Sequence, residues 1–89
     1  MITVKLITGS DFEVVVKSKS TTQHKVHVSN DFYKLLTDAK FSYENLIKAS
    51  FEFLLERESN NSILSQFDLK VISHYFPEYE KEIKRRLKA

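Results

Sequence analysis

Three histidines have the widest chemical range in this chain, since imidazole can bind metals and transfer protons near neutral pH. Two of them, His24 and His27, lie three residues apart in a segment of alternating polarity. Residues three apart on a strand point to opposite faces, so these two cannot hold one ion together. His74 stands beside Tyr75 and Phe76, without an acidic neighbour that would orient its ring. We therefore expect structural histidines and no metal site.

The carboxylates and hydroxyls fall into patterns that have a structural explanation. The acids at positions 44, 52 and 56 share one helical strip with Lys48, and those from 78 to 82 fall where a helix begins. A catalytic acid pair needs a pocket that shifts its pKa values, and no pattern suggests one. The sequence has no G-x-S-x-G turn, and its single glycine cannot build a phosphate-binding loop. We expect no catalytic residue, no cofactor and no enzymatic activity.

An aromatic group around Pro77 is the candidate for protein recognition. It consists of Tyr75, Phe76 and Tyr79. Exposed aromatic side chains often anchor interfaces, which would make this a protein-interaction site. The alternative is that these rings are buried where two helices meet.

The composition predicts one globular domain over residues 1–89. Hydrophobic residues make up 42% of the chain and charged residues 29%, as in ordinary soluble proteins. No apolar run approaches the roughly 20 residues that cross a bilayer, and the start lacks the features of a signal peptide. Cysteine is absent, which suits a reducing compartment. We expect a cytoplasmic protein with no membrane partner.

Alternating polarity at the start predicts three strands. Residues 2–17 read as a hairpin that turns at Gly9, the residue best able to adopt a positive φ. A polar connector over 17–22 leads to a third strand over 23–29. There the valines at 26 and 28 share one face, while Gln23, Lys25 and His27 share the other.

The rest of the chain reads as helices, so the predicted class is α+β. A short helix over 31–36 follows a cap at positions 29–31, and Ser42 caps a long helix over 42–58. The long helix is apolar around most of its circumference and must be covered on several sides, by this chain or by a second copy. Asp68 caps a further piece over 69–74, and Pro77 suits the first turn of a last helix with a basic end.

Residues 24–58 resemble the ribbon-helix-helix family of bacterial DNA-binding proteins. The likeness lies in the strand around Lys25-Val26-His27-Val28, a short helix, and a second helix that opens at Ser42. It implies a homodimer whose two strands pair into a ribbon in the major groove of double-stranded DNA. The polar strand face, Gln23, Lys25 and His27, would then contact bases, and the start of the helix at Ser42 would contact a phosphate.

The leading hypothesis is therefore a small dimeric DNA-binding regulator, such as a repressor or an antitoxin. The net charge of +2 permits nucleic-acid binding and does not demand it. The alternative is a protein-interaction module with no nucleic-acid role, in which the polar strand face is the solvated side of an ordinary sheet. The pairing of strand 23–29, within its own chain or with its twin, separates the two hypotheses.

Overall fold

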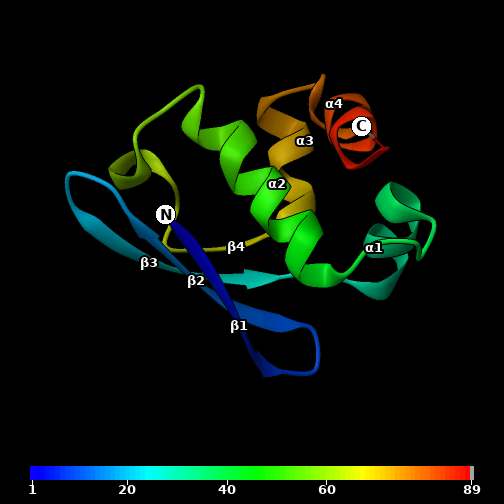
Figure 1. The fold of residues 1–89 in the computed structure, drawn as a ribbon, viewed down its shortest axis with the longest axis horizontal. Coiled ribbons are helices and arrows are strands. Elements are labelled where there is room, and N and C mark those ends of the chain that lie inside the picture. Colours follow the sequence, from blue (N-terminus) through cyan, green and yellow to red (C-terminus); the bar gives the residue numbers. More distant parts are fainter. Residues whose placement is uncertain (89) are drawn as a thin grey trace.

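The computed structural model describes residues 1–88 as a four-stranded sheet with helices gathered on one of its faces (Figure 1). In chain order the elements are β1 (Ile2–Thr8), β2 (Asp11–Lys17), β3 (Thr21–His27), α1 (Asn30–Thr37), α2 (Tyr43–Leu55), η1 (Asn60–Ser62), β4 (Gln66–Asp68), η2 (Leu69–Val71), α3 (Ile72–Tyr75) and α4 (Tyr79–Lys88). The predicted α+β class is confirmed. Among these helices, none is long and apolar enough to cross a membrane.

The sheet has the strand order β1-β2-β3-β4. The first three strands are antiparallel, and β1 turns into β2 at Gly9, whose φ of +52° is one that other residues rarely adopt. The third strand begins at Thr21, so the end of the predicted polar connector belongs to it. A short strand that the sequence analysis did not predict, β4, pairs in parallel with β3.

Side-chain caps fix where the helices begin, as predicted. The hydroxyl of Ser29 accepts the N–H of Phe32 at 3.1 Å, and that of Ser42 accepts the N–H of Asn45 at 3.0 Å. These bonds satisfy backbone donors that have no partner inside the helix. The long helix ends at Leu55, three residues before the predicted 58.

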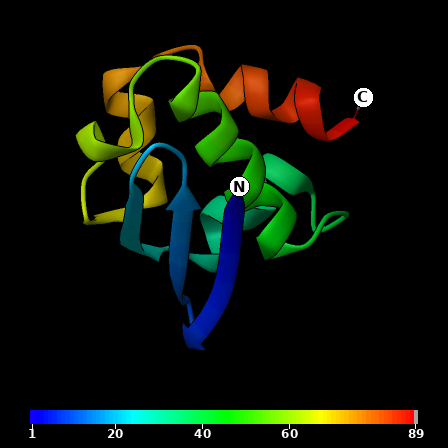
Figure 2. The same ribbon diagram turned by 60° about the vertical axis from the view of Figure 1, so that its left-hand side comes forward.

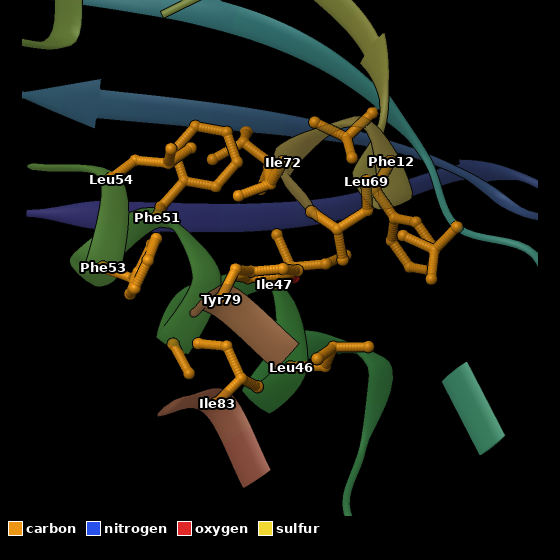
Figure 3. Packing of buried hydrophobic residues seen from close by; sticks show 14 of the residues in the cluster. Phe12, Leu46, Ile47, Phe51, Phe53, Leu54, Leu69, Ile72, Tyr79 and Ile83 are labelled. Atoms are coloured by element: carbon orange, nitrogen blue, oxygen red, sulfur yellow. The ribbon is translucent and has the colours of Figure 1, made fainter. Parts of the chain in front are cut away.

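The core lies between the sheet and α4, with α2 at its centre. On α2, Leu46, Ile47, Phe51 and Phe53 are all fully buried. Figure 3 shows side chains from β2, α2, α3 and α4 gathered into one cluster around them. The broad apolar arc of α2 is thus covered within one chain, and burying it does not require a second copy.

The other face of the sheet is left open in both views of the fold (Figures 1 and 2). Burial alternates along β2 and β3, with one set of side chains in the core and the next set exposed or half-buried. This is the pattern of an antiparallel sheet with one solvated face.

Candidate functional site

The predicted DNA-contacting side chains of β3 share the open face of the sheet. Gln23, Lys25 and His27 are all exposed, as the alternation predicted. Acidic residues stand beside them: Lys25 lies opposite Glu13 in the register, and Nδ1 of His27 is 2.9 Å from Oδ1 of Asp11. Cross-strand pairs of opposite charge stabilise a sheet. They also place negative charge where a phosphate backbone would approach.

The pairing of β3 differs from what the ribbon-helix-helix resemblance implies. One edge of β3 is hydrogen-bonded to β2 and the other to β4, and the N–H of Lys25 donates to the carbonyl of Ser65 at 2.8 Å. Over residues 25–27 both edges of β3 are therefore used inside the chain, so these residues cannot also pair with a twin strand in this arrangement. Ser42, the predicted phosphate contact, is exposed at the start of α2, and its hydroxyl caps that helix.

The three predicted interface aromatics have different environments. Tyr75, at the end of α3, is 68% exposed, whereas Phe76 is half-buried and its ring packs against Phe53. Tyr79 is fully buried, so its assignment to the interaction surface is wrong. Its hydroxyl lies 2.6 Å from that of Ser50 inside the core. Burial raises the pKa of the Tyr79 phenol far above its ordinary value, so this group stays protonated.

Tyr75 stands at the rim of an apolar groove between the end of α2, the segment that precedes β4, and α3. The groove has a volume of about 260 Å³. It is lined by Leu54, Glu58, Ser62, Ile63, Leu64, Phe67, Val71, Ile72, Tyr75 and Phe76. Its floor includes buried side chains, of which Ile72 is one, while Leu64 at the rim is 51% exposed. Two large side chains, Leu64 and Tyr75, therefore present apolar surface to water beside an apolar hollow.

Sequence reasoning found Tyr75 and Phe76 and missed Leu64. Ile63 and Leu64 are adjacent apolar residues outside any helix, so one can face the core while the other faces out. Ile63 is buried and Leu64 is not. The sequence signal that could have revealed Leu64 is its place in an apolar pair directly after the turn-forming stretch 59–62.

A buried histidine holds the wall of this groove in place. Nδ1 of His24 lies 2.7 Å from the carbonyl of Leu64 and, since a carbonyl only accepts, this nitrogen carries the proton. With the proton on Nδ1, the other ring nitrogen, Nε2, accepts a hydrogen bond from the hydroxyl of Thr22 at 2.8 Å. The same Thr22 oxygen accepts from Asn60 Nδ2 at 3.1 Å, and that amide also donates to the carbonyl of Ser20 at 3.1 Å. Segment 60–64 is thereby tied to the sheet.

The lining of the groove is mainly apolar. Its lining contains one carboxylate, that of Glu58, and no histidine. Within residues 1–88, no three histidine, aspartate or glutamate side chains are grouped so that they could hold a metal ion. His74 is exposed on α3.

Polar groups next to the groove are engaged with one another. The guanidinium of Arg57 lies 3.6 Å from the centre of the Phe53 ring and donates to the carbonyl of Phe53 at 3.0 Å. Its Nη2 also lies 3.5 Å from Oε2 of Glu78, so this ion pair joins the end of α2 to the turn before α4. These contacts bind the end of α2 to the segment that carries Tyr75 and Phe76.

Comparisons with protein-family models, with curated proteins and with solved structures find no significant match, so the chain's own geometry is what supports a function.

Proposed function

We propose that this protein is a protein-interaction module that takes an apolar side chain of a partner into the groove beside α3. The observation that carries the proposal is the exposure of Leu64 and Tyr75 above an apolar floor. Covering such surface releases about 25 cal/mol for each Å² of apolar area removed from water. Tyrosine is also among the residues enriched at the centres of interfaces.

The surroundings of the groove match the anatomy of a protein interface. Interfaces combine an apolar centre with a polar rim. Here the hydroxyl groups of Ser62 and Tyr75 and the carboxylate of Glu58 border the apolar lining. A partner segment that carries an apolar side chain flanked by hydrogen-bond donors fits this arrangement.

The groove is also held in shape before a partner arrives. The His24 bond fixes the Leu64 segment from one side, and Arg57 binds α2 to the turn before α4 on the other. Binding to a preformed surface loses less conformational entropy than binding to a mobile one. Rigidity of this kind favours recognition.

Photo-crosslinking tests the proposal directly. A photoreactive phenylalanine derivative replaces Tyr75 in the full chain, which is expressed and irradiated in its native cells. The matched control carries the same group at Lys81, an exposed position of α4 outside the groove. We expect a discrete protein adduct from position 75 and none from position 81. The same adducts from both positions, or none from position 75, would contradict the proposal.

Duplex DNA binding by the open face of the sheet is the second candidate. The observation in its favour is that Gln23, Lys25 and His27 lie exposed on one face. Because β3 pairs with β2 along its length and with β4 over residues 25–27, a homodimer that binds DNA would associate through another surface. Labelled random-sequence duplex should bind at low salt, weaken steeply as salt rises and weaken further in Lys25→Ala. An absence of binding even at low salt would end this candidate.

A further inference from the structure

A second hollow lies at the opposite end of the helical layer, where α1 and α4 end side by side (Figure 1). It has a volume of about 310 Å³. It is lined by Leu35, Leu36, Thr37, Asp38, Lys40, Phe41, Lys84 and Lys88. We call these residues the basic pocket. Its size is in the range of small-molecule sites.

Four of the five cations of α4 fall into two sets with different surroundings, and the fifth, Lys81, lies outside both. Arg85 and Arg86 both bind the carboxylate of Glu82, and Arg86 also reaches Glu56 at 2.6 Å. Lys84 and Lys88, one turn apart, line the basic pocket together with Lys40. Among residues 1–88, no carboxylate lies within ion-pair distance of these three lysines. The arginines are paired with carboxylates of their own chain at its surface, whereas the lysines line the hollow.

The basic pocket also exposes apolar surface. Leu35 is 50% exposed although it follows the helical spacing of a core residue, and Phe41 is half-buried beside it. The buried Leu36 adds to the lining. The aliphatic stems of lysines can extend such a surface while their ammonium groups stay in water. A ligand that fits must therefore have an apolar body as well as negative charge.

The loop that carries Lys40 and Phe41 is fixed in position. Asp38 and Ala39 both have a positive backbone φ, at 54° and 59°, and residues other than glycine rarely adopt such angles. Buried Thr37 supports them: its hydroxyl accepts the N–H of Ala39 at 3.0 Å, and its carbonyl accepts the N–H of Lys40 at 2.9 Å. The hydroxyl of Tyr33 donates to the carbonyl of Phe41. The pocket wall is thus preformed.

The type of anion follows from what surrounds the lysines. Both helices present their C-terminal ends here, and these ends carry partial negative charge and offer no free N–H groups. The lining has no arginine, and Asp38 adds one negative charge. Phosphate sites commonly combine lysine charges with backbone N–H groups or an arginine fork, and neither of these two is present among the described residues that line this pocket. Three lysine charges, reduced by one carboxylate and by two helix ends of roughly half a negative charge each, leave about one positive charge, which suits a single negative charge.

We propose that the basic pocket binds an amphiphilic carboxylate, a small molecule with one carboxylate on an apolar chain. The apolar chain lies against Leu35 and Phe41, and the carboxylate lies among Lys40, Lys84 and Lys88. This site is separate from the groove beside α3 and does not depend on the function proposed for that groove.

An NMR titration of the ¹⁵N-labelled full chain with octanoate tests the proposal. Amide signals of residues 35–41 and 84–88 should shift and saturate, while those of the groove stay in place. Octanol supplies the same chain without the charge, and acetate supplies the charge without the chain. Both should bind far more weakly than octanoate. Equal affinity for octanol, equal affinity for acetate, or shifts confined to other residues would overturn the proposal.

Matched variants locate the charge and the apolar contact. The double variant Lys84→Gln with Lys88→Gln should weaken octanoate binding roughly tenfold, as expected for the loss of two exposed ion pairs. Lys81→Gln, which removes an exposed lysine of α4 outside the pocket, should leave it unchanged. Leu35→Asp should abolish binding, whereas Leu64→Asp, at a position of almost equal exposure, should not. The amide spectrum of each variant reports its fold. Equal losses in test and control variants would contradict the assignment.

Discussion

Tyr75 and Tyr79 stand four residues apart and have opposite environments. Tyr75 ends the short helix α3 and is 68% exposed at the groove, whereas Tyr79 begins α4 and is fully buried. The Tyr79 hydroxyl needs a partner inside the core and finds it in Ser50 at 2.6 Å. A ring whose polar end is satisfied internally serves the fold. A ring left in water beside an apolar hollow is available to a partner.

The same comparison explains a polar residue on the apolar arc of α2. Ser50 is fully buried, and besides contacting Tyr79 its hydroxyl donates to the carbonyl of Leu46 at 2.8 Å. A buried hydroxyl without a partner would destabilise the core. Ser50 and Tyr79 therefore support each other, and Tyr75 has no such role.

Removing the buried ring should have the largest effect on stability. Tyr79→Ala deletes a ring that packs against Phe53 and Phe32, and it leaves a cavity between α2 and α4. We expect the free energy of unfolding in urea to fall by about 3–5 kcal/mol, as for other large core residues. Tyr79→Phe, which keeps the ring, should lose only about 1 kcal/mol. If Tyr79→Ala lowered the free energy of unfolding by less than about 1 kcal/mol, the ring would not be part of the core.

His24→Ala should have the next largest effect. It removes the bond to the Leu64 carbonyl, leaves Thr22 without its acceptor, and deletes a ring whose centre lies 5.4 Å from that of Phe51. We expect a loss of about 2–3 kcal/mol in urea unfolding. Hydrogen exchange should quicken in residues 60–64 more than in β1. Unchanged exchange in that segment would mean that His24 does not hold the groove wall.

The ion pairs within α4, together with the pair from Arg86 to Glu56 at the end of α2, should make stability depend on pH. Hydrogen bonds from Arg85 and Arg86 lower the pKa of Glu82 from its ordinary 4.5 to about 2, and the bond from Arg86 also lowers that of Glu56. Because the folded-state pKa is depressed, this stabilisation is fully present above pH 4.5 and is lost as the pH falls towards 2. Arg86→Met should flatten the decline in unfolding free energy over this interval, and Lys81→Met should not. An identical decline in both variants would contradict the assignment.

Removing the exposed ring should have the smallest effect on stability. Tyr75→Ala should change the free energy of unfolding by less than about 0.5 kcal/mol, as is usual for surface positions. It should nevertheless weaken partner binding by about 2 kcal/mol, roughly thirtyfold, as expected for an interface anchor. Thermal unfolding and calorimetric titration separate the two quantities. A large loss of stability would place Tyr75 in the fold with Tyr79.

Local patterns predicted much of this fold, because caps, turns and periodicity act over a few residues. The hairpin with Gly9 and the caps at Ser29 and Ser42 have such local signals. The environment of the Tyr75–Phe76–Tyr79 group was left open, since spacing alone does not reveal which ring faces the core.

The groove and the fourth strand could not be predicted, because both depend on contacts between distant segments. β4 has three residues, too few for an alternating pattern, and pairs with β3 some forty positions earlier in the chain. The groove exists because that pairing, together with the bond from His24 to Leu64, brings residues 62–67 beside α3. Neither contact has a signature within a short window of sequence.

The most direct test of the central claim is a calorimetric titration of this chain with the partner protein that crosslinks to position 75. Leu64 is 51% exposed at the groove and Leu35 is 50% exposed at the basic pocket, so the same substitution can be made at two equally accessible leucines. The groove account predicts that Leu64→Asp weakens binding by roughly tenfold or more, since it places a charge in an apolar contact, while Leu35→Asp leaves the affinity unchanged. Equal affinities for both variants and the unaltered chain would contradict it.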